Sequence, residues 1–129
     1  MWEKWVFIAA CAGITCLLRS TVGDIVAAGG AEFASALLDE CAAIAGSQGY
    51  PPRATSIAQS RTTLTAPGSL LAASMFRDIE RGAPIEASHM IGDLSRRGEE
   101  KGIASPLLRV AHAHLKAYEA RRARESDHN

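Results

Sequence analysis

Apolar positions along most of this chain recur at intervals of three and four residues, which is the spacing of one face of an α-helix. The clearest stripe lies within residues 31–48 and consists of Leu37, Leu38, Cys41, Ile44 and Ala45. Gly49 and the two prolines that follow it then end this helix. Because no run alternates apolar and polar residues convincingly with period two, the pattern predicts an all-α fold.

The same spacing predicts further helices over residues 2–20, 53–64, 70–81, 86–101 and 106–122, with a short helix after Gly23. We expect Ser69 to cap the helix over 70–81, and Ser105-Pro106 has the order of an N-cap followed by a first-turn proline. The apolar run 6–18 is too short to cross a bilayer, so we expect a buried helix there rather than a membrane span or a signal peptide.

Composition fits one compact domain. With 129 residues and 47% apolar content, the chain can bury a core, and we expect a single domain over residues 1–125 with a tail over 126–129. The 14 acidic and 14 basic residues balance, so no net charge attracts nucleic acid or an anionic membrane. We interpret the basic cluster at the C-terminus as a solvated helix end; it comprises Lys116, Arg121, Arg122 and Arg124.

The cysteines and histidines do not suggest a metal centre. Cys11, Cys16 and Cys41 lie within apolar runs and have no metal-like spacing, which predicts buried thiols in a reducing cytoplasm. His112 and His114 are two residues apart and diverge around a helix, whereas His89 and His128 are isolated. We therefore predict no bound metal.

The segment 74–86 is polar where a small helical core should be apolar. Ser74 and Asp78 are four residues apart, so a helix places both side chains on one face. Glu86 follows a Gly-Ala-Pro turn and is expected at the start of the next helix, where the helix dipole favours a carboxylate. A solvated helix face and a functional face both fit this pattern.

Three motifs resemble the ketopantoate reductase (2-dehydropantoate 2-reductase) family. Residues 73–86, ASMFRDIERGAPIE, are similar to its S-S-M-x-x-D-(x)n-G-x-x-T-E block. Trp2-Glu3-Lys4 resembles its W-x-K signature, and residues 96–106 resemble its R-x-G-x-x-x-G-I-x-x-P stretch. The resemblance covers residues 2–118 and implies the family's C-terminal helical domain, which has a 6-phosphogluconate dehydrogenase C-terminal-like fold.

That resemblance also implies partners. The family's N-terminal Rossmann domain holds NADPH, and this sequence has no strand followed by G-x-G-x-x-G, since Gly29-Gly30 lies between helical segments. We therefore expect a Rossmann domain in cis or in trans, a small 2-keto acid as substrate, and homodimerisation as a further association. Whether the chain is a truncated form or a separately encoded half stays open at this point.

The resemblance assigns roles to four residues. Lys4 matches the family's catalytic lysine, which hydrogen-bonds the keto oxygen and protonates it during hydride transfer. Glu86 matches the catalytic glutamate that positions the lysine and the substrate hydroxyl, and Ser74 would bind the substrate carboxylate. Asp78 is expected to have a supporting role.

Four family positions that are usually polar are apolar in this chain, namely Ile8, Ala12, Ile91 and Leu108. A pocket without those partners should bind a polyhydroxylated acid poorly, because each buried hydroxyl would lack a hydrogen bond. One hypothesis is an NADPH-dependent reductase of a more apolar 2-keto acid or another carbonyl compound. The alternative is a catalytically retired helical module that dimerises, with an exposed apolar groove at these four positions.

Overall fold

The computed structural model describes residues 1–127, and this part of the chain contains helices and no strand. The helices are α1 (Trp2–Leu18), α2 (Val22–Ala27), α3 (Ala31–Ser47), α4 (Ala54–Leu64), α5 (Ser74–Glu80), α6 (Met90–Glu100) and α7 (Pro106–Ser126). The prediction of an all-α fold is confirmed. His128, which the sequence left as an isolated histidine, lies outside the described residues.

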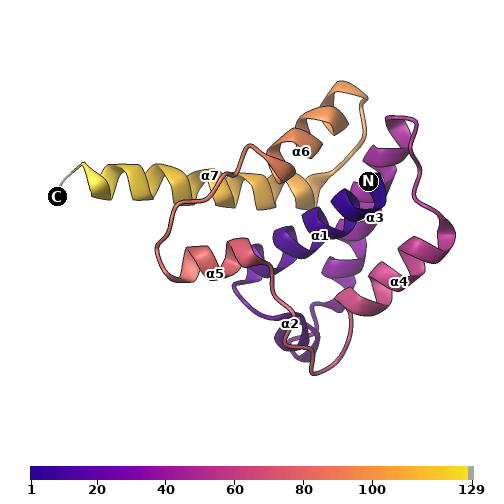
Figure 1. The fold of residues 1–129 in the computed structure, drawn as a ribbon, viewed down its shortest axis with the longest axis horizontal. Helices are drawn as coiled ribbons and strands as arrows, with labels where there is room; N and C mark the ends of the chain where they lie inside the picture. The colour runs from indigo at the N-terminus through magenta and orange to yellow at the C-terminus, as the bar shows by residue number, and fades with distance from the viewer. Residues whose placement is uncertain (128–129) are drawn as a thin grey trace.

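Helix α1 is the centre of the domain and packs against each of the other helices (Figure 1). Its middle, from Ala9 to Cys16, is buried on every side, as expected of a helix that is apolar all round. Gly13 permits the close approach of α3, because a Cβ at this position would lie 2.8 Å from Cδ2 of Leu37. The stripe predicted for α3, from Leu37 to Ala45, is fully buried against this face.

The helix predicted over residues 70–81 begins four residues late, at Ser74. Ser69 does not cap it, because the Ser69 hydroxyl accepts a hydrogen bond from the N–H of Leu71, two residues away, at 3.1 Å. The carbonyls of Ser69 and Leu71 accept hydrogen bonds from Gly23 and Val22 at the start of α2, at 2.8 and 2.9 Å. These long-range bonds hold residues 70–73 in an extended conformation.

The helix predicted over residues 86–101 also begins late, at Met90, with His89 as its N-cap. Glu86 therefore lies in the loop before α6, and the prediction that it stands at the positive end of a helix dipole is wrong. The loop is instead fixed by tertiary contacts, because its backbone bonds to side chains of α7 replace the local bonds that a helix would make.

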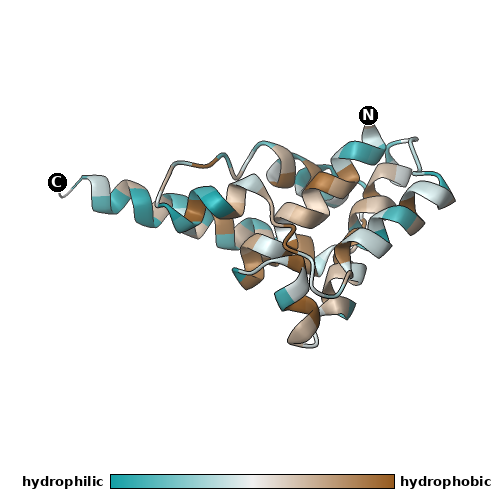
Figure 2. Ribbon diagram, turned by 60° about the horizontal axis from the view of Figure 1, so that its bottom comes forward, coloured by the Kyte–Doolittle hydropathy of each residue, from teal (hydrophilic) through white to brown (hydrophobic). Residues whose placement is uncertain are grey.

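Helix α7 begins at Pro106, as the sequence predicts, but its cap comes from another helix. The carboxylate of Glu40 in α3 accepts hydrogen bonds from the N–H groups of Leu107 and Leu108, at 3.2 and 2.9 Å. The helix continues through Ser126, and its last turns project from the body of the domain, where Figure 2 shows many hydrophilic positions. None of the helices in the described residues is long and apolar enough to cross a membrane.

Candidate functional site

One face of α1 borders a cavity of about 280 Å³. Lys4 stands on this face, four residues before Ile8, so it lies about 6 Å from Ile8 along the helix axis. The opposite wall is formed by the extended segment that precedes α5 and by the first residues of α5. The side chains around the cavity are Phe7, Ile8, Cys11, Ala12, Leu71, Ala72, Ala73, Ser74, Met75 and Met90.

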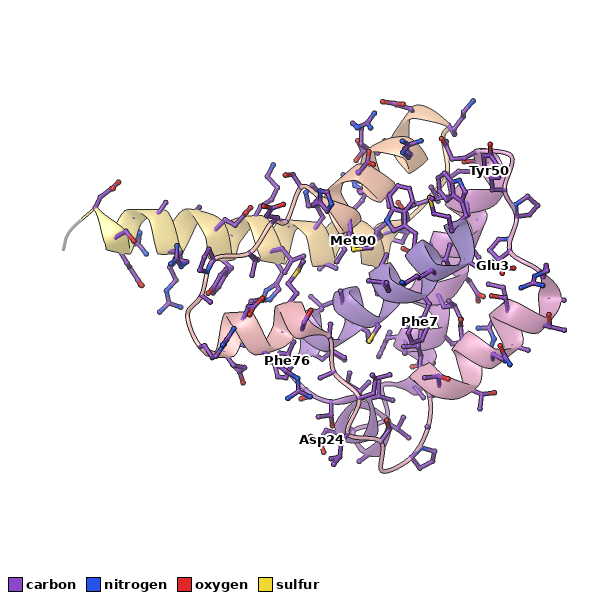
Figure 3. The ribbon with its side chains drawn as sticks, viewed as in Figure 1. Glu3, Phe7, Asp24, Tyr50, Phe76 and Met90 are labelled. Carbon is purple, nitrogen blue, oxygen red and sulfur yellow. The ribbon has the colours of Figure 1, made fainter. Side chains whose placement is uncertain are left out.

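Met90 closes this cavity from the start of α6, and Figure 3 shows it beside α1. The indole N–H of Trp5 donates a hydrogen bond to the carbonyl of Met90 at 3.2 Å. This bond fixes the first turn of α6 against the first turns of α1. The segment that begins α6 is therefore part of the cavity wall rather than a free loop.

A second cavity, of about 400 Å³, adjoins the first and contains three of the residues that the sequence predicted. Ser74, Asp78 and Glu86 line it together, with Met75 among the residues common to both cavities. The expected shared face of Ser74 and Asp78 is thus observed, and Glu86 faces them across the turn that follows α5. Lys4 lines neither cavity and stands at the α1 side of the first.

Helix α7 holds the loop that carries Glu86. The hydroxyl of Tyr118 donates to the carbonyl of Ala83 at 2.6 Å, and Nε of Arg122 donates to the carbonyl of Gly82 at 2.9 Å. On the other side of Glu86, the N–H of Ala87 donates to the Glu119 carboxylate at 3.3 Å. Glu86 is exposed, but its backbone is fixed on both sides.

The polar groups of the site differ in whether they are already engaged. Within residues 1–127, no hydrogen bond or ion pair within the protein engages the ammonium group of Lys4, the hydroxyl of Ser74 or the carboxylate of Glu86. Asp78, in contrast, forms an ion pair with Arg81, the residue that directly follows α5. Lys4, Ser74 and Glu86 are therefore available to a ligand, whereas Asp78 is committed to its own helix.

The four positions that are apolar in this chain but usually polar in the family that it resembles fall into two pairs. Ile8 and Ala12 line the cavity beside α1. Ile91 and Leu108 are fully buried in the core. The prediction of an exposed apolar groove is therefore wrong at Ile91 and Leu108, because α6 and α7 bury these side chains against the body of the domain.

The sequence did not identify Phe7, Cys11 or Met90 as cavity residues. Phe7 and Cys11 could have been found from their spacing of three and seven residues from Lys4 on α1, but no signal along the chain connects Met90 to this face. Cys11 is 5% exposed, and burial raises the pKa of its thiol to about 11. All three cysteines are buried free thiols, as predicted.

A compact aromatic cluster lies at the N-terminal end of α1. The rings of Trp2 and Tyr50 stack with centroids 5.6 Å apart, and the guanidinium of Arg97 lies 5.7 Å from the Trp2 ring and 5.6 Å from the Trp5 ring. Figure 3 shows Tyr50 near this end of α1 and Glu3 turned toward the segment that leads into α4. The cluster fixes the start of α1, and with it the position of Lys4.

Comparison with known proteins shows the family to which this fold belongs. The family model described as ketopantoate reductase PanE/ApbA C-terminal matches residues 1–119. An uncharacterized oxidoreductase of Bacillus subtilis (strain 168), YkpB, is 34% identical over 121 residues, which cover 93% of this chain and 40% of that protein. The chain thus spans less than half the length of this curated relative.

Solved structures share the fold. A dimeric ketopantoate reductase from Staphylococcus aureus superposes with a TM-score of 0.82 at 23% identity, covering 94% of this chain and 43% of that one. A 2-dehydropantoate 2-reductase from Methylococcus capsulatus gives a TM-score of 0.79 at 26% identity, covering 94% and 42%. Since the family model spans nearly all of the helices that form the two cavities, this chain belongs to the ketopantoate reductase PanE/ApbA C-terminal family.

Proposed function

We propose that this chain is the helical substrate domain of an NADPH-dependent reductase that converts a 2-oxo acid into the 2-hydroxy acid. One observation carries the proposal. Ser74 and Glu86 line a cavity that adjoins the Lys4 face of α1, and these three polar groups have no partner elsewhere in residues 1–127. All three side chains are exposed and solvated in the free chain, so a bound substrate can take the place of that water.

The proposed reaction needs a proton donor for the carbonyl oxygen. NADPH, when bound by its own domain, would supply a hydride to the carbonyl carbon, so that negative charge would develop on the carbonyl oxygen. The Lys4 ammonium donates one proton to this oxygen, which gives the alcohol and leaves a neutral amine. Because the Lys4 side chain is exposed, the amine regains its proton from water.

The other polar groups bind and orient the substrate. The Ser74 hydroxyl donates a hydrogen bond to the substrate carboxylate. The Glu86 carboxylate accepts hydrogen bonds from the Lys4 ammonium and from the hydroxyl of the product, which holds both in line. Asp78 supports α5 through its ion pair with Arg81 and does not contact the substrate.

The dinucleotide is held outside this chain. Residues 1–127 contain no strand and hence no strand, glycine-rich loop and helix of the kind that cradles a pyrophosphate. We assign NADPH binding to an N-terminal Rossmann domain, in cis or in trans, and we expect no metal in the reaction. We also propose that the protein forms a homodimer and that it is located in the cytoplasm.

The test is loss of NADPH absorbance with a panel of 2-oxo acids, using this chain joined to or mixed with its nucleotide-binding domain. Lys4→Ala should lower kcat by about 100-fold to 10,000-fold, the contribution of a general acid. Lys116→Ala is the matched control, because Lys116 is also an exposed lysine on a helix. Wild-type turnover by the Lys4 variant would exclude Lys4 as the proton donor.

A second candidate is a catalytically retired dimerisation or interaction module. The apolar residues Ile8 and Ala12 at the cavity favour it, because they leave a hydroxylated substrate without partners. A folded assembly that binds NADPH and dimerises, yet reduces none of the 2-oxo acids, would support this candidate over the reductase.

A further inference from the structure

The cavity beside α1 differs in chemistry from the cavity that it adjoins. Among the described residues that line it, no side chain is charged, and the polar side-chain groups are limited to the Ser74 hydroxyl and the Cys11 thiol. The adjoining cavity contains the carboxylates of Asp78 and Glu86. Ser74 and Met75 stand where the two meet, so a ligand that spans both cavities has one polar end and one apolar end.

Several backbone groups in the apolar walls, at Cys11, Leu71 and Ala73, are already engaged. The buried Thr15 hydroxyl donates to the carbonyl of Cys11 at 2.7 Å and accepts from the N–H of Ala73 at 3.3 Å. Leu71 donates its N–H to Ser69 and accepts from Val22 through its carbonyl. A hydroxyl group that entered between these walls would lose its water and could not bond to these engaged groups, which weakens binding.

The size and the sulfur content of the cavity suit an aromatic ring. Its volume is about 280 Å³, and an engineered apolar cavity of about 150 Å³ is already enough to bind benzene. Three sulfur atoms line it, from Cys11, Met75 and Met90, beside the ring of Phe7. Thioether sulfur makes favourable contacts with aromatic rings, and methionine adapts its shape to fill the space around them.

We propose that this cavity holds the side chain of the substrate, so that the preferred 2-oxo acid carries a phenyl-sized apolar side chain without a hydroxyl group. The inference rests on the proposed function and specifies its substrate class. The carboxylate and keto group lie at the Ser74 end, toward Glu86, and Ile8 and Ala12 select against a hydroxylated side chain.

Binding can be measured on this chain alone through the reactivity of Cys11. A small uncharged thiol reagent, methyl methanethiolsulfonate, is added with and without phenylglyoxylate, and modification of each cysteine is followed by peptide mass spectrometry. Phenylglyoxylate should slow the modification of Cys11, whereas ketopantoate at the same concentration should not. Cys16 and Cys41 are each 0% exposed and serve as internal controls for general unfolding.

A matched ligand pair isolates the hydroxyl group. Ketopantoate and 3,3-dimethyl-2-oxopentanoate differ only by a hydroxyl in place of a methyl group. Wild-type protein should bind the methyl compound roughly 10-fold to 100-fold more tightly, the cost of one buried hydroxyl without a partner. Ile8→Asn supplies an amide and should reverse or abolish this preference, while Ile57→Asn, at a partly buried isoleucine of α4 away from the cavity, should leave it unchanged.

The outcomes separate this inference from the proposed function. Tighter binding or faster reduction of ketopantoate than of its methyl counterpart by the wild type would overturn the inference and leave the reductase standing. Protection of Cys11 by phenylglyoxylate, with no 2-oxo acid reduced by the complete two-domain protein, would support the apolar cavity and overturn the reductase. Equal modification of Cys11 with and without phenylglyoxylate would also overturn the inference.

Discussion

The hydroxyl of Thr15, in the last turn of α1, accepts a hydrogen bond from the N–H of Ala73 at 3.3 Å, across 58 positions of the chain. The same hydroxyl donates to the carbonyl of Cys11 at 2.7 Å, and the Thr15 side chain is fully buried. One side chain therefore joins the two walls of the apolar cavity. It also satisfies a backbone N–H at the residue where the extended segment turns into α5.

Thr15→Val should destabilise the domain by about 1 to 3 kcal/mol, because it keeps the shape of the side chain and leaves the Ala73 N–H without its partner. The measurement is urea denaturation followed by circular dichroism. Thr62→Val is the matched control, since Thr62 also donates to the carbonyl four residues before it but is exposed. If Thr15→Val and Thr62→Val lowered the free energy of unfolding by the same small amount, the hydrogen bond to Ala73 would contribute nothing to stability.

Tyr118→Phe should loosen the loop that carries Glu86, because it removes the 2.6 Å hydrogen bond to the Ala83 carbonyl. Amide hydrogen exchange over residues 82–87 should become faster, while the core of α1 keeps its protection. Tyr50→Phe is the control, because Tyr50 is exposed and its hydroxyl has no hydrogen bond in the described part of the chain. Unchanged exchange over this loop would mean that Glu119 and Arg122 suffice to hold it.

How far the sequence predicts this molecule depends on whether a feature is local. The helices follow from apolar spacing, and the stripe of α3 is buried at each predicted position, from Leu37 to Ala45. The late start of α5 does not follow, because the carbonyls of Ser69 and Leu71 bond to α2, some 46 to 49 positions away. The spacing of apolar residues along the chain does not predict such a long-range hydrogen bond.

In the candidate site, too, the local features can be predicted from the sequence and the long-range contacts cannot. Ser74 and Asp78 meet because four residues separate them on one helix, which the sequence gives directly. Met90 reaches the α1 face through tertiary contacts, among them the hydrogen bond from the Trp5 indole to its carbonyl, 85 positions away. Ile91 and Leu108 match cleft positions of the family by motif, yet they are core residues here, and only the packing of α6 and α7 reveals it.

The pairing of Glu3 with Arg53 should make stability depend on pH at the acid end. Hydrogen bonds from the Arg53 side chain and then from its backbone N–H lower the pKa of Glu3 from 4.5 to about 2. A carboxyl whose pKa is lower when folded stabilises the protein above its unfolded pKa, and this contribution disappears as the pH falls through the folded pKa.

The melting temperature of the wild type should therefore exceed that of Glu3→Gln by a constant amount above about pH 4.5, and the difference should shrink as the pH falls toward 2. Arg53→Met should reduce this pH-dependent difference without abolishing it, because the backbone N–H at position 53 still donates to the Glu3 carboxylate at 2.8 Å. The double variant should lose no more than the sum of the two single ones. If the difference in melting temperature between the wild type and Glu3→Gln stayed constant down to pH 2, the lowered pKa of Glu3 would be contradicted.

The stacking of Arg97 on Trp2 and Trp5 should be visible in the intrinsic fluorescence, because these are the two tryptophans of the chain. Arg97→Met removes the cation over both rings and its 3.0 Å hydrogen bond to Gln48. We expect a shifted emission maximum and a loss of about 0.5 to 2 kcal/mol in the free energy of unfolding.

The adjacent Arg96 provides the control for that change. Its guanidinium pairs with Asp93 and Glu100 on the surface of α6, so Arg96→Met should leave the emission unchanged and should lower the free energy of unfolding less than Arg97→Met does. Equal spectra for the two variants would mean that Arg97 does not stack on the rings in solution. A selective shift for Arg97→Met would show that α6 contacts the two tryptophans in the first turns of α1, where Lys4 also stands.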